Sequence, residues 1–128
     1  MRKGIEIRDA HFPDRAPIDA YGNGGFRFAD MSHRGSLLCL PSGIHGWDAT
    51  QDSMLEPKLF SRIFEEADDI EVLLVGTGPE IRRLPQALKI RLRDAGIISD
   101  PMSTGAAVRT YNVMLAESRA VAAALISV

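Results

Sequence analysis

The residues best suited to chemistry stand where an apolar segment runs into a glycine-rich turn. Residues 70–75 are Ile-Glu-Val-Leu-Leu-Val, and Gly76-Thr77-Gly78 follows directly. Such an apolar run is typical of a strand buried on both faces of an α/β sheet. Glycines at the carboxyl end of that strand leave backbone amides open to an anion. The motif lacks the lysine of a phosphate-binding loop and the third glycine of a dinucleotide fingerprint, which favours a tight strand-to-loop exit.

A second polar group belongs to a predicted helix over residues 104–115. Arg109 and Asn112 are three residues apart and share one face of that helix. An arginine facing a glycine-rich turn can bind a carboxylate or phosphate with two hydrogen bonds. The same arginine can also form an internal ion pair with Glu117, and the sequence leaves both possibilities open. The candidate ligand-binding residues are therefore Gly76, Thr77, Gly78, Thr104, Arg109, Thr110 and Asn112.

The other residue types that carry chemistry form no recognisable group. The three histidines are widely spaced along the chain, and none has a second histidine or a cysteine at metal-ligand spacing. No Gly-x-Ser-x-Gly elbow occurs. The single cysteine, Cys39, lies in the apolar run 37–40, which favours a buried structural thiol over a nucleophile. We therefore expect no metal, no cofactor and no catalytic site.

Composition and charge narrow the class of protein. The chain has 128 residues, which predicts one domain over 1–128, with an irregular N-terminal extension over 1–17. Its net charge of -2 argues against binding to nucleic acid. No apolar run approaches the ~20 residues of a membrane helix, and the N-terminus has no apolar signal core. These features predict a cytoplasmic protein.

The hydrophobic pattern predicts alternating strands and helices. Helix starts are expected at Pro57, at Pro85 and at Thr104 or Ser103, and a helix end is expected at Gly96. The predicted elements are a short strand around 18–21, a hairpin of strands 26–29 and 36–40, a loop or short strand over 44–48, a helix over 57–67, a strand over 70–75, a helix over 85–95, a parallel edge strand over 97–102, a helix over 104–115 and a final strand over 121–128. The alanines of the last segment would also fit a helix.

Two segments together resemble a known family. The segments are 70–78 and 104–119, and the second carries an Arg-Thr-Tyr-Asn core over 109–112. They are similar to the small domain-of-unknown-function family that includes the mitochondrial complex I (NADH dehydrogenase) assembly factor 3, of which this chain resembles a bacterial member. One difference stands at position 103, where the family tends to carry an aspartate and this chain has Ser103.

The resemblance implies an α/β fold of three layers, with a central mixed five-stranded sheet and helices packed around it. The last strand would lie antiparallel within that sheet, between the hairpin and the strand that ends in Gly-Thr-Gly. The implied function is help in building a respiratory complex through protein contacts, with its subunits or assembly factors as partners. Any membrane association would be peripheral, at the inner membrane and through a partner. The candidate interaction residues are Trp47, Tyr111, Glu117 and Arg119.

A different class of function is a small-molecule-binding protein or enzyme. Its site would lie between the Gly-Thr-Gly turn and the helix over 104–115. This alternative predicts an enclosed polar pocket into which Thr77, Arg109 and Asn112 point. The basic residues between Arg82 and Arg93 are a solvated helix face on the simplest interpretation, or else a patch for an acidic partner or an anionic membrane.

Overall fold

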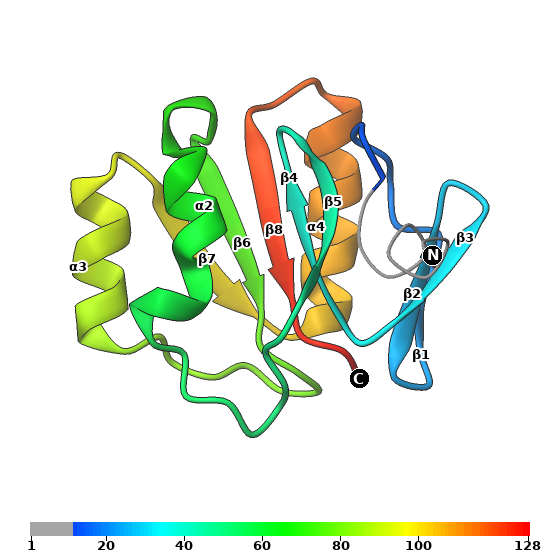
Figure 1. Ribbon diagram of the computed structural model, residues 1–128, viewed down its shortest axis with the longest axis horizontal. Coiled ribbons are helices and arrows are strands. Elements are labelled where there is room, and N and C mark those ends of the chain that lie inside the picture. The colour runs from blue at the N-terminus through cyan, green and yellow to red at the C-terminus, as the bar shows by residue number, and fades with distance from the viewer. Residues whose placement is uncertain (1–11) are drawn as a thin grey trace, which may run out of the picture.

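The computed structural model describes residues 12–128, and most of the expected extension over 1–17 lies outside them (Figure 1). Strands and helices alternate from residue 57 onward, as the hydrophobic pattern predicts. The elements are β1 (Ala20–Gly22), β2 (Gly25–Phe28), β3 (Met31–Arg34), β4 (Ser36–Leu40), β5 (Gly43–Trp47), the 3₁₀ helix η1 (Pro57–Phe60), α2 (Ser61–Glu65), the 3₁₀ helix η2 (Ala67–Asp69), β6 (Val72–Gly76), α3 (Gln86–Asp94), β7 (Ile98–Met102), α4 (Thr104–Ala116) and β8 (Val121–Leu125).

The main sheet is mixed and has five strands in the order β5-β4-β8-β6-β7. This confirms the predicted α/β class and the predicted place of the last strand, between the hairpin and β6. β8 is antiparallel to β4, as expected, and parallel to β6 on its other side. β7 is parallel to β6 and forms an edge of the sheet, because the intervening α3 makes a crossover connection.

The hairpin of the main sheet differs from the predicted one. The segments 26–29 and 36–40 do not pair with each other. β2 instead pairs with β1 and β3 in a separate three-stranded sheet, and β4 pairs with β5, which makes residues 43–47 a full strand. Sequence reasoning missed β3 because Ala29 and Asp30, which connect it to β2, both have positive φ, at 48° and 62°. Two-residue hairpin turns of this kind usually carry asparagine or glycine.

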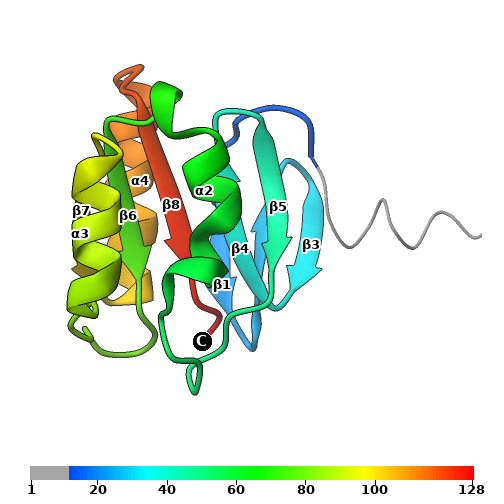
Figure 2. The ribbon, with the colours of Figure 1, turned by 60° about the vertical axis from the view of Figure 1, so that its left-hand side comes forward.

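The five-stranded sheet is covered on both faces. Figures 1 and 2 show α2 and α3 on one side and α4 with the three-stranded sheet on the other. Successive residues of β6 serve the two sides, since Leu73 packs in the cluster under α2 and α3 while Leu74 packs in the cluster under α4. The alanines of β8, in the middle of the sheet, are fully buried. The described part of the chain is therefore organised in three layers.

Local features agree with these helix boundaries. The Ser103 hydroxyl accepts a hydrogen bond from the Ala106 amide at 3.3 Å and so caps α4. Gly96 follows α3 with φ of +83°, a conformation that favours glycine at a helix end. Within residues 12–128, no helix is both long enough and apolar enough to cross a membrane.

Candidate functional site

The Gly-Thr-Gly turn lies against the first turn of α4. In Figure 1 the ends of β6 and β8 meet the start of this helix. A Cβ atom on Gly76 would lie 2.9 Å from the Thr104 Cα and 3.2 Å from the Ala107 Cβ. Glycine at position 76 therefore lets the helix pack directly on the end of the strand. We call this contact of residues 76–78 with Thr104 the strand–helix junction.

Thr104 holds the junction together through hydrogen bonds on both sides. Its hydroxyl accepts from the Gly78 amide at 3.0 Å and donates to the Ile126 carbonyl at 2.7 Å. The Thr104 amide in turn donates to the Gly78 carbonyl at 2.8 Å. The residue is fully buried. One side chain thus joins the turn after β6, the start of α4 and the chain that leaves β8.

Thr77 fixes the loop that follows the turn. Its hydroxyl accepts from the Arg82 amide at 2.8 Å and has the Glu80 and Met102 carbonyls as acceptors, at 2.9 and 3.1 Å. Thr77 is 1% exposed. The two threonine hydroxyls that were candidates for ligand binding are therefore already bonded within the protein.

The remaining candidate residues of α4 lie away from the junction. Asn112 is about 12 Å further along the helix than Thr104, at 1.5 Å per residue. Its side-chain amide accepts from the Ile18 amide and donates to the Ile18 carbonyl, both at 2.9 Å, as a neighbouring strand would. Arg109 is exposed and Thr110 half-buried. The structure thus brings Gly76, Thr77, Gly78 and Thr104 together, and it leaves Arg109, Thr110 and Asn112 elsewhere.

The four candidate interaction residues divide into two buried and two exposed ones. Trp47 stacks edge-on against Phe60, with ring centroids 5.4 Å apart, and donates from Nε1 to the Leu59 carbonyl. Tyr111 is 1% exposed. Both aromatic residues belong to the core. Glu117 and Arg119 are exposed and form an ion pair of 3.9 Å at the end of α4.

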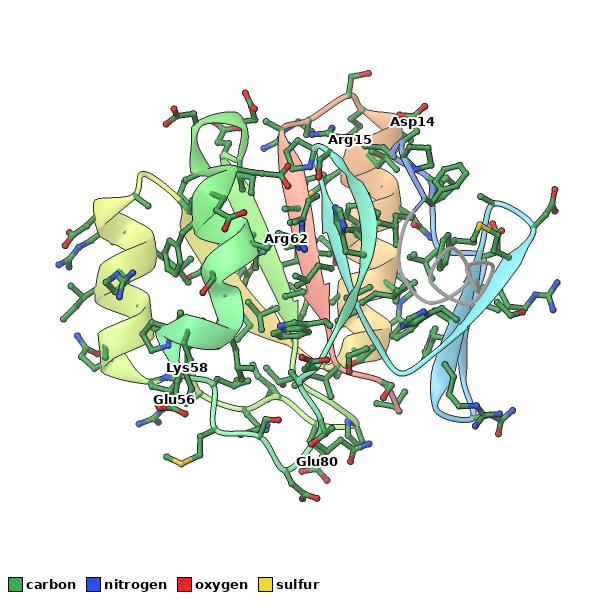
Figure 3. The ribbon with its side chains drawn as sticks, in the orientation of Figure 1. Asp14, Arg15, Glu56, Lys58, Arg62 and Glu80 are labelled. Carbon is green, nitrogen blue, oxygen red and sulfur yellow. The ribbon has the colours of Figure 1, made fainter. Side chains whose placement is uncertain are left out.

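Arg119 also takes part in a contact with the N-terminal segment. Its carbonyl accepts from Arg15 Nη1 at 3.2 Å. Figure 3 shows Asp14 and Arg15 at the end of the molecule where α4 finishes. Together with the bonds between Asn112 and Ile18, this contact holds residues 15–18 along α4.

The basic segment after β6 is partly used within the protein. Arg82 donates to the Gln51 and Ser53 carbonyls at 3.2 and 2.9 Å. The Arg91 guanidinium lies over the Phe64 ring, 4.9 Å from its centroid. These two arginines stabilise neighbouring segments, so the segment is less of a free cationic patch than its sequence suggests.

A further polar cluster joins the β4–β5 turn to the end of α2, and sequence reasoning missed it. Glu66 accepts from the Ser42 amide at 2.9 Å and from the Ser42 hydroxyl at 2.6 Å. His45 Nε2 lies 2.9 Å from the same hydroxyl. Ser42 and Glu66 are 24 residues apart, so no local motif connects them. Within residues 12–128, no three histidine, cysteine or acidic side chains are grouped to hold a metal ion.

Cys39 and Tyr111 form a buried pair beneath α4, and the prediction of a buried thiol is confirmed. Burial raises the pKa of the Cys39 thiol from its ordinary value of 9.0 to about 12, although a hydrogen bond with Tyr111 lowers it slightly. Burial, followed by the charge of Cys39, also raises the pKa of Tyr111. The thiol is therefore protonated at neutral pH and unsuited to act as a nucleophile.

We expect this thiol to make the protein less stable in alkali. Above pH 9 the unfolded thiol loses its proton while the folded thiol keeps it up to about pH 12. The unfolded state then binds fewer protons, so the free energy of unfolding falls as pH rises, by about 1.4 kcal/mol per pH unit. Denaturant unfolding at pH 8, 9, 10 and 11 should show the fall setting in above pH 9 in the native protein, and a shallower fall in Cys39→Ala, where the raised pKa of Tyr111 still contributes. Equal slopes would contradict the assignment.

This chain is similar in sequence to known proteins over most of its length. A family model described as "Protein of unknown function (DUF498/DUF598)" matches residues 18–126. An uncharacterised protein of Rhodobacter capsulatus is 38% identical over 119 residues, which are 93% of this chain and 90% of that protein. NADH dehydrogenase (ubiquinone) 1 alpha subcomplex assembly factor 3 of Mus musculus is 31% identical over 127 residues, which are 98% of this chain and 68% of that protein.

A solved structure shares the fold. The crystal structure described as an outer membrane protein from Bartonella henselae is 64% identical to this chain and superimposes with a TM-score of 0.86. The match covers 91% of this chain and 98% of that one.

Proposed function

Because the chain belongs to the DUF498/DUF598 family of proteins of unknown function, we propose that it is a non-catalytic binding protein that assists the assembly of respiratory NADH dehydrogenase. The family resemblance found in the sequence is confirmed by this membership. The observation that carries the proposal is the likeness to the mouse assembly factor 3, which runs through almost the whole chain. Its partners are subunits or other assembly factors of that complex.

The geometry of the strand–helix junction favours binding of a partner on the exposed surface rather than binding of a small molecule in a pocket at the junction. A small molecule held between the turn and α4 would need the hydroxyls of Thr77 and Thr104, and both are bonded to backbone groups of the chain itself. Removing those bonds to bind a ligand would leave buried polar groups unpaired, at about 1–3 kcal/mol each. Function is therefore better sought on the exposed surface.

We propose that the exposed surface of α4 and β7 binds the partner protein, because each of these two elements leaves a large apolar side chain exposed. Val113 on α4 is 59% exposed and Ile98 on β7 is 64% exposed. Ile98 points to the α4 side of the sheet, because Met102, an even number of residues away on the same strand, packs in the cluster on that side. Val113 lies nine residues along α4 from Thr104, and Ile98 lies four residues along β7 from Met102. Both stretches are about 13 Å long, so the two residues lie at a similar distance from the strand–helix junction. We call this pair the α4–β7 surface.

The location we propose follows from the same function. The protein would work in the bacterial cytoplasm and reach the inner membrane only through its partner. Fractionation of cells into cytosol, inner membrane and outer membrane tests this directly. Recovery in the cytosol and, with the assembling complex, in the inner membrane is the expected result, and recovery in the outer membrane alone would contradict it.

Removal of the protein from its host tests the proposed function. We expect cells that lack it to contain less assembled NADH dehydrogenase, seen as in-gel NADH oxidation after native electrophoresis. Another membrane complex, such as ATP synthase, should be unchanged in the same gel and serves as the control. Normal amounts of assembled NADH dehydrogenase in the deletion strain would rule out the proposal.

A further inference from the structure

The outer face of the three-stranded sheet carries a hollow that the proposed function does not use. Phe26 and Phe28 of β2 point into the core, so the residues that alternate with them point outward. The hollow has a volume of about 400 Å³ and lies over all three strands. Small-molecule sites usually measure about 300–1,000 Å³. Its lining includes Ala20, Gly22, Gly25, Arg27, Ser32 and Arg34.

The strand register explains why this face is hollow. Ala20, Arg27 and Ser32 lie opposite one another across the three strands, and Gly22, Gly25 and Arg34 form the next row. Four of these six residues have a side chain no larger than a hydroxymethyl group. The floor is therefore backbone and small side chains, and the two long side chains are both arginines.

The two arginines lie within reach of each other. Arg27 lies opposite Ser32, and Arg34 is two residues beyond Ser32 on β3, so the arginines are diagonal neighbours on one face. Cα atoms in this relation are about 7–8 Å apart, a separation that long side chains can span. Both residues are exposed. Their guanidinium groups can therefore converge on one bound group.

No acid balances this charge inside the hollow. Within residues 12–128, neither arginine forms an ion pair or a side-chain hydrogen bond. The nearest acids in sequence, Asp19 and Asp30, stand at strand ends and do not line the hollow. His33 contributes to the lining, but its Nε2 donates to the Ser36 carbonyl at 3.1 Å. Two like charges side by side repel each other, and a bound anion would turn that repulsion into attraction.

We propose that this hollow binds a phosphate group, carried by a soluble phosphate compound or by a lipid headgroup, between Arg27 and Arg34. The planar guanidinium matches phosphate oxygens with two parallel hydrogen bonds. The Ser32 hydroxyl stands between the arginines and supplies a further donor. The glycine floor lets the phosphate approach the sheet closely. This site is separate from the strand–helix junction and from the α4–β7 surface.

Nuclear magnetic resonance titration of the full chain with pyrophosphate tests the site. We expect amide shifts concentrated in residues 20–34, and an affinity at least tenfold weaker in the double variant Arg27→Gln/Arg34→Gln. The matched control is Arg62→Gln/Arg83→Gln, which removes the same charge from exposed positions outside this sheet; Figure 3 labels Arg62 on α2. The control should bind within twofold of the native chain. Equal affinity of both double variants, or shifts outside residues 20–34, would overturn the proposal.

Further experiments identify the source of the phosphate and control for misfolding of the glutamine variant. Arg27→Lys/Arg34→Lys keeps the charge but loses the paired hydrogen bonds of the guanidinium groups. Its affinity for pyrophosphate should lie between that of the native chain and that of the glutamine variant. Sedimentation with vesicles of phosphatidate in phosphatidylcholine, dependent on the same arginines, would indicate the lipid source. Binding to the soluble probe alone would indicate the soluble source. Binding to an oligoglutamate peptide but to neither phosphate probe would overturn the proposal, because it would indicate an acidic protein segment.

Discussion

Replacing Thr104 by valine should destabilise the protein by about 2–6 kcal/mol. Valine has nearly the same shape as threonine but no hydroxyl, so the Gly78 amide and the Ile126 carbonyl both lose a partner in a fully buried place. Each buried group left unpaired costs about 1–3 kcal/mol. Denaturant unfolding followed by circular dichroism measures the loss in the free energy of unfolding.

Serine is the matched control at this position. Thr104→Ser keeps the hydroxyl and removes one methyl group, for which we expect a loss near 1 kcal/mol. If Thr104→Val and Thr104→Ser lower the free energy of unfolding equally, the hydroxyl does not hold the junction. The argument against a bound ligand at the junction then becomes weaker. A large difference between them supports a structural role for a residue that the sequence presents as a candidate for binding.

Replacing Gly76 by alanine should cost up to about 3 kcal/mol, the upper end of the usual range for overpacking. The new methyl group would meet the Thr104 backbone at 2.9 Å and the Leu125 side chain at 3.2 Å. A backbone atom inside a helix cannot turn away, so α4 must shift from the strand. Unfolding by denaturant gives the size of the effect.

Gly105→Ala is the comparison for this variant. The added Cβ at position 105 would meet only the hydroxyl end of Tyr21, a side chain that is 42% exposed and can rotate outward. Alanine also favours helix over glycine by about 1 kcal/mol, so we expect a net change within about 1 kcal/mol. Similar losses at both positions would show that β6 and α4 are not in the tight contact described.

The second half of the fold could be predicted from the sequence because its patterns are long and regular. The run over 70–75, the helical spacing after Pro57 and Pro85, and the stop at Gly96 each indicate one element. The three-stranded sheet could be predicted only in part: the alternation over 26–29 indicates β2, and a short strand around 18–21 overlaps β1. β3 and the pairing of the three strands could not be predicted, because the strands have three or four residues and the turn at Ala29 and Asp30 lacks the usual residue types.

The candidate site shows a different limit of sequence reasoning. The sequence predicts that the Gly-Thr-Gly turn and the start of the helix over 104–115 border one candidate ligand site, whereas the structure packs them directly on each other. Residue type alone does not say whether a hydroxyl faces a ligand or a backbone group. In the structure the hydroxyls of Thr77 and Thr104 both bond to backbone groups. Asn112 bonds to Ile18, 94 residues away, so no local pattern could have placed it. The arginine pair depends on the register of β2 and β3, which only the structure gives.

In the function we propose, the protein assists NADH dehydrogenase assembly through its exposed α4–β7 surface. The most direct measurement is the amount of assembled NADH dehydrogenase in the deletion strain after the gene is returned as native or variant protein. Ile98→Glu/Val113→Glu alters this surface. Met54→Glu/Ile81→Glu makes the same change at two other exposed apolar residues, 76% and 65% exposed, and is the matched control. All proteins should accumulate equally on immunoblots.

We predict that the native chain and the Met54/Ile81 variant restore the assembled enzyme, and that the Ile98/Val113 variant leaves it near the level of the deletion strain. Equal restoration by both variants would contradict a role for the α4–β7 surface. An unaltered amount of enzyme in the strain without the protein would contradict the assembly function itself.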